Sequence, residues 1–152
     1  MKILVMSDSH GSRDNVEKII EMHKDASAVI ILGDGVRDYE NYEYIYDNLK
    51  FCYVSGNCDW YSEYPEECIE IFAGKRVFFS HGHKYGVKFG YSAIMERAES
   101  LNADICLFGH THNKFYHYEN DIHYFNPGAA VQGYFGLISI QNGDILISDG
   151  RV

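Results

Sequence analysis

The chain has 152 residues, of which 46% are hydrophobic and 23% are charged. This composition excludes a disordered segment and suits one domain with a sizeable core. Its formal net charge of -9 at pH 7 argues against strong nucleic-acid binding, which needs clustered Lys and Arg. No apolar run approaches the roughly 20 residues that span a bilayer, so we expect no membrane partner.

The first third of the chain alternates between strand and helix patterns. Residues 2–6 are continuously apolar and include Ile and Val, which predicts a strand buried on both faces. Residues 14–24 place apolar side chains at helical spacing. Residues 28–32 predict a second buried strand, residues 38–49 a helix with tyrosines on one side, and residues 51–54 a third strand.

The middle of the chain continues the alternation. Residues 68–72 and 76–79 flank Ala73-Gly74-Lys75, a pattern typical of a hairpin. Residues 91–101 form a good amphipathic helix pattern, and residues 104–108 predict a further buried strand. The polar segment between residues 54 and 68 contains Pro65 and several tyrosines, so we expect a loop there.

The last third changes to antiparallel patterns. Residues 114–119 and 122–126 alternate around a turn signal, and residues 135–141 and 144–149 flank Asn142-Gly143, the strongest hairpin signal in the chain. The pattern alone therefore predicts an α/β fold with an antiparallel tail. There is no repeat, low-complexity tract or linker, so we expect a single domain over residues 1–152.

The four cysteines show neither CxxC spacing nor a small disulfide framework. Two of them lie in apolar runs, as buried thiols do. This usage favours a reducing compartment, and we expect a cytoplasmic protein.

Five of the predicted strands end in a short polar motif. In open α/β sheets, ligands bind beyond the carboxyl ends of strands, where loops bring distant residues into one crevice. These motifs supply two carboxylates, one amide and four imidazoles: Asp8, His10, Asp34, Asn57, His81, His110 and His112. One structural zinc usually takes only four ligands, often thiolates, so this set better suits two divalent ions that share a carboxylate.

The pair His110 and His112 follows the apolar run that ends at Gly109. Residues two apart in extended backbone point to the same side, so both imidazoles can reach one small volume. The glycine permits a sharp turn. Taken alone, the pair is equally compatible with the polar end of a strand.

The chain resembles the calcineurin-like metallophosphoesterase superfamily in five motifs that occur in family order: Asp8-x-His10, Gly33-Asp34, Gly56-Asn57-Cys58-Asp59, His81-Gly82-His83 and Gly109-His110-Thr111-His112. The small size, the Cys after Asn57 and the segment Asn126-Pro127-Gly128 are similar to its compact prokaryotic phosphodiesterase branch. The resemblance covers nearly the whole chain. It implies a four-layer α-β-β-α sandwich of two mixed sheets with helices outside.

The resemblance also implies two metal ions. One would be held by Asp8, His10, Asp34 and His112. The other would be held by Asp34, Asn57, His81 and His110, so that Asp34 bridges the two. This mixed nitrogen and oxygen set favours Mn²⁺ and is also compatible with Ni²⁺, Fe, Zn²⁺ or Co²⁺.

The implied function is metal-dependent hydrolysis of a small phosphoester, more readily a diester than a monoester, by a hydroxide that bridges the two metals. Asn57, His110 and His83 are the predicted catalytic residues. Many superfamily members have His after the motif Asn as a proposed acid for the leaving group, whereas this chain has Cys58. A thiol with a pKa near ~8.5 fits that role poorly. Either good leaving groups are cleaved fastest, or another group such as His83 donates the proton.

Two alternatives remain open from the sequence: a phosphomonoesterase, or a non-catalytic scaffold on the same fold. The eukaryotic retromer scaffold subunit shares the implied fold and has an impaired metal site. Here every ligand position holds a competent residue, which favours an enzyme. The many tyrosines between residues 39 and 64 are compatible with packing at the core edge, with the rim of a cleft, or with the surface of a homo-oligomer.

Overall fold

The computed structural model describes all residues from Met1 to Val152. The first sheet has the strand order β10-β9-β1-β2-β3 and contains β1 (Lys2–Met6), β2 (Ala28–Ile31), β3 (Lys50–Tyr53), β9 (Tyr134–Gln141) and β10 (Asp144–Arg151). The second sheet has the order β4-β5-β6-β8-β7 and contains β4 (Glu67–Phe72), β5 (Lys75–Ser80), β6 (Ile105–Leu107), β7 (Phe115–Glu119) and β8 (Ile122–Asn126).

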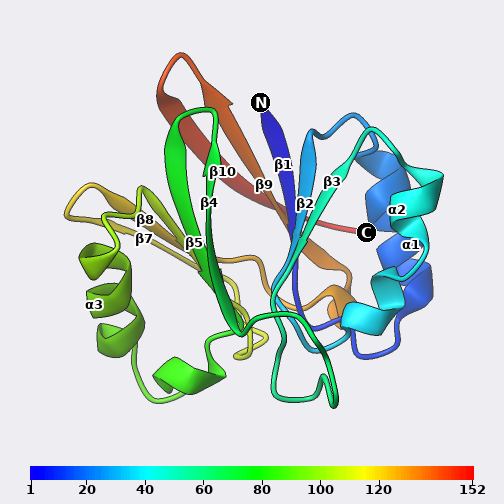
Figure 1. The fold of residues 1–152 in the computed structure, drawn as a ribbon, viewed down its shortest axis with the longest axis horizontal. Coiled ribbons are helices and arrows are strands. Elements are labelled where there is room, and N and C mark those ends of the chain that lie inside the picture. The colour runs from blue at the N-terminus through cyan, green and yellow to red at the C-terminus, as the bar shows by residue number, and fades with distance from the viewer.

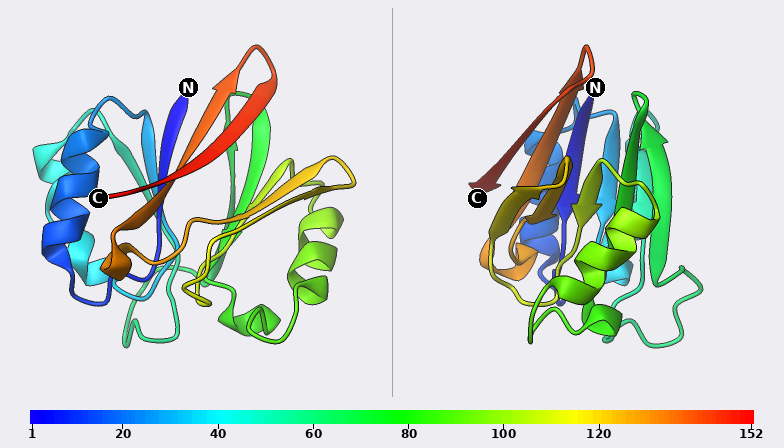
Figure 2. Two further views of the ribbon diagram at one scale, coloured as in Figure 1. Left: turned by 180° about the vertical axis from the view of Figure 1, so that it is seen from behind. Right: turned by 90° about the vertical axis from the view of Figure 1, so that its left-hand side faces the viewer.

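The two sheets pack face to face and helices cover their outer faces (Figure 1, Figure 2). Helices α1 (Arg13–Met22) and α2 (Tyr42–Ile45) lie against the first sheet, and α3 (Ser92–Ser100) lies against the second. Both sheets are mixed: β1, β2 and β3 are parallel while β9 runs antiparallel to β1, and β5, β6 and β8 are parallel while β4 and β7 are antiparallel to their neighbours. The predicted four-layer sandwich is therefore confirmed.

The apolar strands are continuous in sequence because both of their faces are buried. In β1, Ile3 and Val5 point into the core between the sheets, and Leu4 and Met6 point to the layer under α1. Each of the four has no exposed surface. The period-two alternation of side chains across a strand explains this division between two cores. A third cluster packs α3 onto the second sheet.

Two predicted elements differ from the structure. The helix expected over residues 38–49 is reduced to a 3₁₀ turn at Val36–Tyr39 and the single turn of α2, because Asn41 has φ 76°, a left-handed value that interrupts a helix. The antiparallel tail is divided between the sheets. The β7–β8 hairpin joins the second sheet beside β6, and the β9–β10 hairpin joins the first sheet beside β1.

The topology brings the carboxyl ends of β1, β2, β3, β5 and β6 to the same end of the molecule, at the bottom of Figure 1. The loops that carry the polar motifs follow these five strands. All four cysteines are free thiols. None of the helices has the length and apolarity that crossing a bilayer requires.

Candidate metal centre

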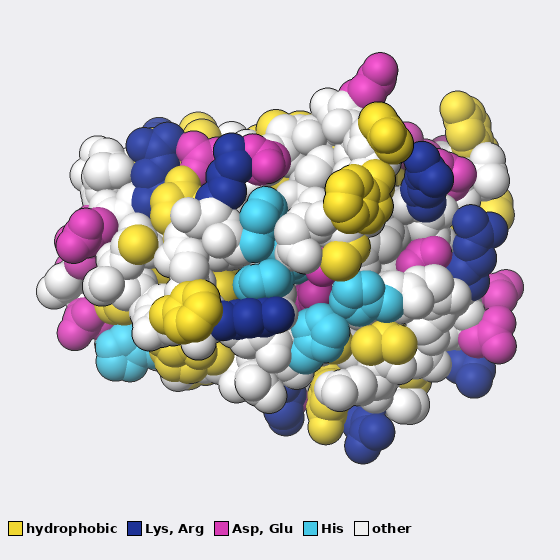
Figure 3. All heavy atoms as spheres, turned by 90° about the horizontal axis from the view of Figure 1, so that it is seen from below, with side chains coloured by type: hydrophobic (Ala, Val, Ile, Leu, Met, Phe, Trp, Pro, Cys, Tyr) yellow, Lys and Arg dark blue, Asp and Glu magenta, His cyan; other side chains and the backbone are white.

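Six of the seven predicted metal ligands converge at this end of the two sheets, in two groups of three. The open group consists of Asp8, His10 and His112, and the buried group consists of Asp34, His81 and His110. Within each group the potential ligand atoms lie within 4.8 Å of one another. Figure 3 looks onto this face and shows histidine side chains gathered near its centre.

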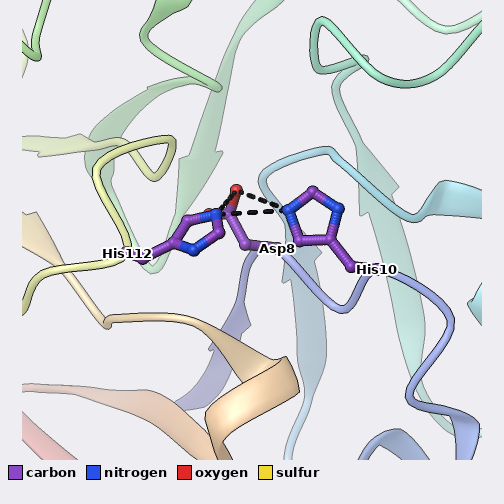
Figure 4. Close-up of side chains that lie close together, drawn as sticks. All are labelled: Asp8, His10 and His112. Carbon is purple, nitrogen blue, oxygen red and sulfur yellow. Dashed lines mark hydrogen bonds and ion pairs between the residues drawn. The ribbon is translucent and has the colours of Figure 1, made fainter.

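In the open group, two imidazoles approach one carboxylate from opposite sides (Figure 4). His112 Nε2 lies 3.1 Å from Asp8 Oδ1, and His10 Nε2 lies 3.7 Å from the same oxygen. The two Nε2 atoms are 3.2 Å apart. The side chains of His10 and His112 are 31% and 37% exposed, whereas that of Asp8 is fully buried. The open group therefore faces solvent through its histidines.

The buried group is centred on His81. Its Nε2 lies 3.3 Å from Asp34 Oδ2 and 3.1 Å from His110 Nδ1, and its Nδ1 donates to the carbonyl oxygen of Leu32 at 2.7 Å. A carbonyl can only accept, so this bond assigns the proton to Nδ1 and leaves a lone pair on Nε2 in the neutral ring. The backbone thus orients His81 with a ligating nitrogen toward the other two side chains.

Asp34 connects the two groups. Its Oδ2 faces His81 Nε2 at 3.3 Å and His10 Nε2 at 3.8 Å, while its Oδ1 accepts the backbone N–H of Cys58 at 2.8 Å. One carboxylate therefore reaches histidines of both groups, as a bridging ligand would have to do.

Asp8 carries an unpaired oxygen inside the protein. Its Oδ2 accepts bonds from Ser7 Oγ at 2.5 Å and from the backbone N–H of His110 at 3.0 Å. Its Oδ1 is buried and accepts no hydrogen bond. An unsatisfied buried carboxylate oxygen is costly unless a cation or donor meets it. The donor set of the two groups fits a bound metal ion at this position.

Electrostatic interactions inside the cluster shift the pKa values of its members in different directions. Burial alone would raise the pKa of Asp34, but the hydrogen bond and charge of His81 outweigh burial and hold this pKa well below its usual range. Burial lowers the pKa of His81, and the carboxylates of Asp34 and Asp8 more than reverse this effect. Burial and the charge of His81 lower the pKa of His110 to about 4. His110 is therefore a neutral imidazole near pH 7, with a lone pair available for a metal.

The backbone at these residues is unusual. Left-handed φ values between 42° and 66° occur at five of the predicted ligands: Asp8, His10, Asp34, His110 and His112. Such a conformation costs a non-glycine residue roughly 1–2 kcal/mol. Neighbouring loops hold it in place, since Asp8 N–H donates to the Gly33 carbonyl at 3.0 Å and His10 N–H to the Asp34 carbonyl at 3.1 Å. Strain is thus concentrated at the candidate site.

These φ values also correct the expectation that His110 and His112 point to the same side of an extended strand. His110 and His112 follow β6 in left-handed conformations, so they do not share one side of a strand. His110 Nδ1 joins the buried group and His112 Nε2 joins the open group. Gly109 lies where the chain passes closest to β1, and a Cβ there would collide with Ser7 Oγ. The glycine is needed for close approach.

Asn57 is the seventh predicted ligand, and its metal role stays a prediction. Its side chain is exposed, and its amide nitrogen contacts Cys58 Sγ at 3.4 Å rather than either group. Cys58 Sγ itself lies within 4.8 Å of ligand atoms of His10 and Asp34. Desolvation and the nearby Asp34 carboxylate raise the pKa of the Cys58 thiol, so it is neutral at pH 7.

His83 lies beside the buried group. Its ring centroid is 5.5 Å from that of His81 and 6.1 Å from that of His110, and its Nε2 is 3.6 Å from Glu66 Oε1. Partial burial and the charge of His81 lower the pKa of His83. Its catalytic role also stays a prediction.

Two carboxylates support the loops of the cluster. Asp59 accepts four backbone N–H groups at 2.7–3.0 Å, from Asp34, Gly35, Val36 and Gly56. Asp59 therefore fixes the backbone of the loops that follow β2 and β3. Asp38 accepts Ser9 Oγ at 2.6 Å and the N–H of Gly11 at 2.8 Å, so it fixes the loop of His10. Sequence reasoning missed Asp38, whose only signal is its place in the loop of Asp34.

A cleft of about 740 Å³ opens beside the two groups. Its lining includes His10 and Asp34 of the two groups, Cys58, and the aromatic residues Trp60, Tyr61 and Tyr64. The site thus has an open approach on the side of the loop that follows β3.

Comparisons with known proteins agree with this geometry. Residues 1–141 match the calcineurin-like phosphoesterase superfamily domain. A phosphodiesterase of Methanocaldococcus jannaschii is 30% identical over 157 residues, which cover 92% of this chain and 90% of that protein. A Bacillus subtilis protein named "Probable metallophosphoesterase" is 30% identical over 112 residues, which cover 74% of this chain and 64% of its own length.

Among solved structures, a predicted phosphoesterase of Streptococcus pneumoniae superimposes with a TM-score of 0.83 at 26% identity, covering 99% of this chain and 88% of that one. The family match extends over nearly the whole chain and includes all five strand-end motifs. The chain belongs to the calcineurin-like phosphoesterase superfamily, a family of metallophosphoesterases.

Proposed function

We propose that this chain hydrolyses phosphodiesters with two divalent metal ions. The observation that carries the proposal is the arrangement of the open and buried groups around one carboxylate, Asp34, together with the buried oxygen of Asp8 that accepts no hydrogen bond. Family membership implies divalent metal ions, and the presence of two groups supports two ions rather than one.

In this proposal each metal has four protein ligands. One is held by Asp8, His10, Asp34 and His112, and the other by Asp34, Asn57, His81 and His110. Asn57 would join the second set through its carboxamide oxygen, which ligates without adding charge. Oxygen and imidazole donors without a thiolate favour Mn²⁺, and they also suit Ni²⁺, Fe, Zn²⁺ or Co²⁺.

The bound cations would supply a hydroxide nucleophile near neutral pH and neutralise charge on the phosphoryl oxygens. Hydrolysis adds one water across the ester bond: its oxygen forms the new P–O bond, the ester P–O bond breaks, and the alcohol leaves with a proton. Leu32 holds His81 in the tautomer that presents Nε2, and His110 is neutral. His110 therefore has a free lone pair, and His81 needs only to release the proton of Nε2 to ligate.

We assign the proton for the leaving group to His83, which lies beside the buried group. The test is the dependence of turnover on leaving-group pKa in aryl diesters. His83→Ala should slow poor leaving groups more than good ones, whereas Cys58→Ala should leave this dependence unchanged. An unchanged dependence in His83→Ala would exclude His83 as the donor.

Diesters suit the cleft better than monoesters. Its walls beyond the metal groups carry four carboxylates and one guanidinium. A phosphodiester carries one negative charge near pH 7, whereas a monoester carries close to two, so the cleft repels the monoester more strongly. The charge of the cleft thus favours a phosphodiesterase over a phosphomonoesterase.

The deciding assay compares bis-p-nitrophenyl phosphate with p-nitrophenyl phosphate, in the presence of each divalent metal in turn and in EDTA. We expect turnover of the diester, highest with Mn²⁺, slower turnover of the monoester, and none in EDTA. Circular dichroism establishes that the protein is folded in every condition. Folded protein with no turnover under any metal contradicts the proposal and favours the scaffold alternative.

A further inference from the structure

The cleft beside the metal groups has an aromatic wall, formed by Trp60, Tyr61 and Tyr64. We propose that this wall is a subsite that binds a planar aromatic substituent of the phosphodiester substrate. The inference rests on the proposed function, because His10 and Asp34 of the metal groups line the same cleft. A phosphate at the metal groups would extend its ester substituent along the cleft toward these rings.

The two rings at the tip of the loop are largely uncovered. Trp60 is 74% exposed and Tyr61 is 96% exposed. Large aromatic side chains that face water beside a cleft are typical of binding surfaces, because covering them releases unfavourably hydrated apolar area. Tyr61 also has a left-handed φ of 62°, a conformation that local sterics disfavour and that concentrates at functional positions.

The loop that presents these rings is anchored on both sides of its tip. Before the tip, the Asp59 carboxylate is held by the four backbone N–H groups that donate to it. After the tip, Ser55 Oγ bonds to Ser62 Oγ at 2.7 Å and to the carbonyl of Tyr64 at 2.8 Å. The Tyr64 ring stacks on Tyr53, with centroids 4.5 Å apart and planes at 21°. Exposed rings on an anchored loop form a preorganised stacking surface.

The charge of the cleft limits what the aromatic group can carry. Beyond the metal groups, the only cation in the lining is Arg37, and the lining also contains four carboxylates: Asp38, Glu40, Asp59 and Glu63. Further phosphates on the substrate would be repelled. A volume of about 740 Å³ is within the range of sites for one small ligand. The subsite therefore suits an uncharged or cationic ring, such as a simple aryl group or a nucleobase, rather than a polyphosphate or a nucleic-acid chain.

A binding experiment can use the chain's own fluorescence, since Trp60 is its only tryptophan. The probe is methyl benzylphosphonate, in which the ring is joined to phosphorus through carbon and cannot be released by hydrolysis. Methyl ethylphosphonate is the matched probe without a ring. With Mn²⁺ present, we expect a saturable change in Trp60 emission with the first probe and no change with the second. Identical responses to both probes would contradict stacking.

A kinetic experiment separates stacking from chemistry. An aryl methyl phosphate and a fluoroalkyl methyl phosphate are chosen so that their leaving alcohols have the same pKa, and they differ only in the ring. Trp60→Ala should raise KM for the aryl diester by roughly tenfold, because one stacking partner is lost. It should change KM for the fluoroalkyl diester by less than about twofold. Trp60→Phe should restore most of the difference. Tyr118→Ala on β7, in the other sheet, is the control.

The outcomes distinguish the subsite from the proposed function. If the wild type hydrolyses both diesters and Trp60→Ala affects them equally, the subsite is overturned and the function stands. If the folded wild type hydrolyses neither diester with any metal, the proposed function fails and the subsite fails with it. Selective loss of the aryl diester in Trp60→Ala, reversed by Trp60→Phe, supports the subsite.

Discussion

The open group and the buried group contain the same types of donor, yet the protein holds them differently. His81 of the buried group has no exposed surface, and a backbone carbonyl fixes its ring. His10 and His112 of the open group are about one third exposed, and their ring nitrogens face each other and the carboxylates. A backbone hydrogen bond therefore fixes His81 of the buried group, whereas the rings of His10 and His112 contact only each other and carboxylates. A preorganised site loses less entropy when it binds its ligand, so we expect the buried group to bind its metal more tightly.

The largest effect should come from Asp34, the one residue that both groups share. Asp34→Asn keeps the size of the side chain and removes the charge that both metals would use. We expect loss of both metals and a fall in diester turnover greater than the ~100-fold that loss of a supporting partner costs. Elemental analysis of dialysed protein measures the metals. Asp47→Asn, which changes an exposed acid outside the site, is the control. Retention of both metals by Asp34→Asn would disprove the bridging role.

Asp59 should have the next largest effect, because it supports Asp34 without touching the metals. In Asp59→Asn the amide group can accept from only one of the two pairs of backbone N–H groups that the carboxylate now satisfies. We expect metal affinity to fall by about 10- to 100-fold. Titration of Mn²⁺ followed by diester turnover measures this affinity. If saturating Mn²⁺ restores most of the turnover, Asp59 acts by positioning; full activity at low Mn²⁺ would contradict its role.

The strands, and the loops that carry the polar motifs, could be predicted from the sequence because each depends on local signals. Apolar runs mark buried strands, and a polar residue after such a run marks a loop at a sheet edge. The family resemblance supplied the four-layer arrangement and the division of the histidines between two metals. Periodicity alone supplied neither, because residues far apart in the chain, such as Ile30 and Phe79, share the core between the two sheets.

Three features of the structure depend on contacts between distant residues, so local sequence patterns do not predict them. The helix expected over residues 38–49 is interrupted at Asn41, since tertiary packing of Tyr39 and Leu49 prevails over a weak helical pattern. The left-handed backbone at Asp8 and His10 is held by hydrogen bonds to the carbonyl groups of Gly33 and Asp34 in another loop. Asp38 belongs to none of the sequence motifs, because its role depends on the loop of His10 folding against it.

Metal content should separate the two groups directly. His112→Ala removes a donor of the open group, and His110→Ala removes a donor of the buried group. Each variant should retain one metal, and the His112→Ala variant should retain it through longer dialysis against EDTA, because its remaining metal is the buried one. Elemental analysis at timed intervals gives the comparison. Loss of the same metal from both variants, at equal rates, would refute the assignment of His110 and His112 to different groups.

The smallest effect is expected at Asn126, which is buried outside both groups and holds the loop that joins them. Its Nδ2 donates to the Gly109 carbonyl at 2.9 Å and to Thr111 Oγ1 at 3.1 Å, and its Oδ1 accepts the N–H of Gly128 at 2.9 Å. Asn126→Ala leaves these buried groups unpaired, so the free energy of unfolding should fall by about 1–3 kcal/mol. Urea denaturation in EDTA measures this loss without the contribution of metal binding.

Asn126→Asp sharpens that comparison, since aspartate can still accept from Gly128 but cannot donate to Gly109 or Thr111. Both variants should lower the metal affinity of both groups to a similar, small degree, because His110 and His112 lie on the same loop and point to different groups. Selective weakening of one metal would show that the loop does not act as a unit. In that case the difference between the groups would lie in the His110–Thr111–His112 segment itself, and not in the way the fold buries one group and exposes the other.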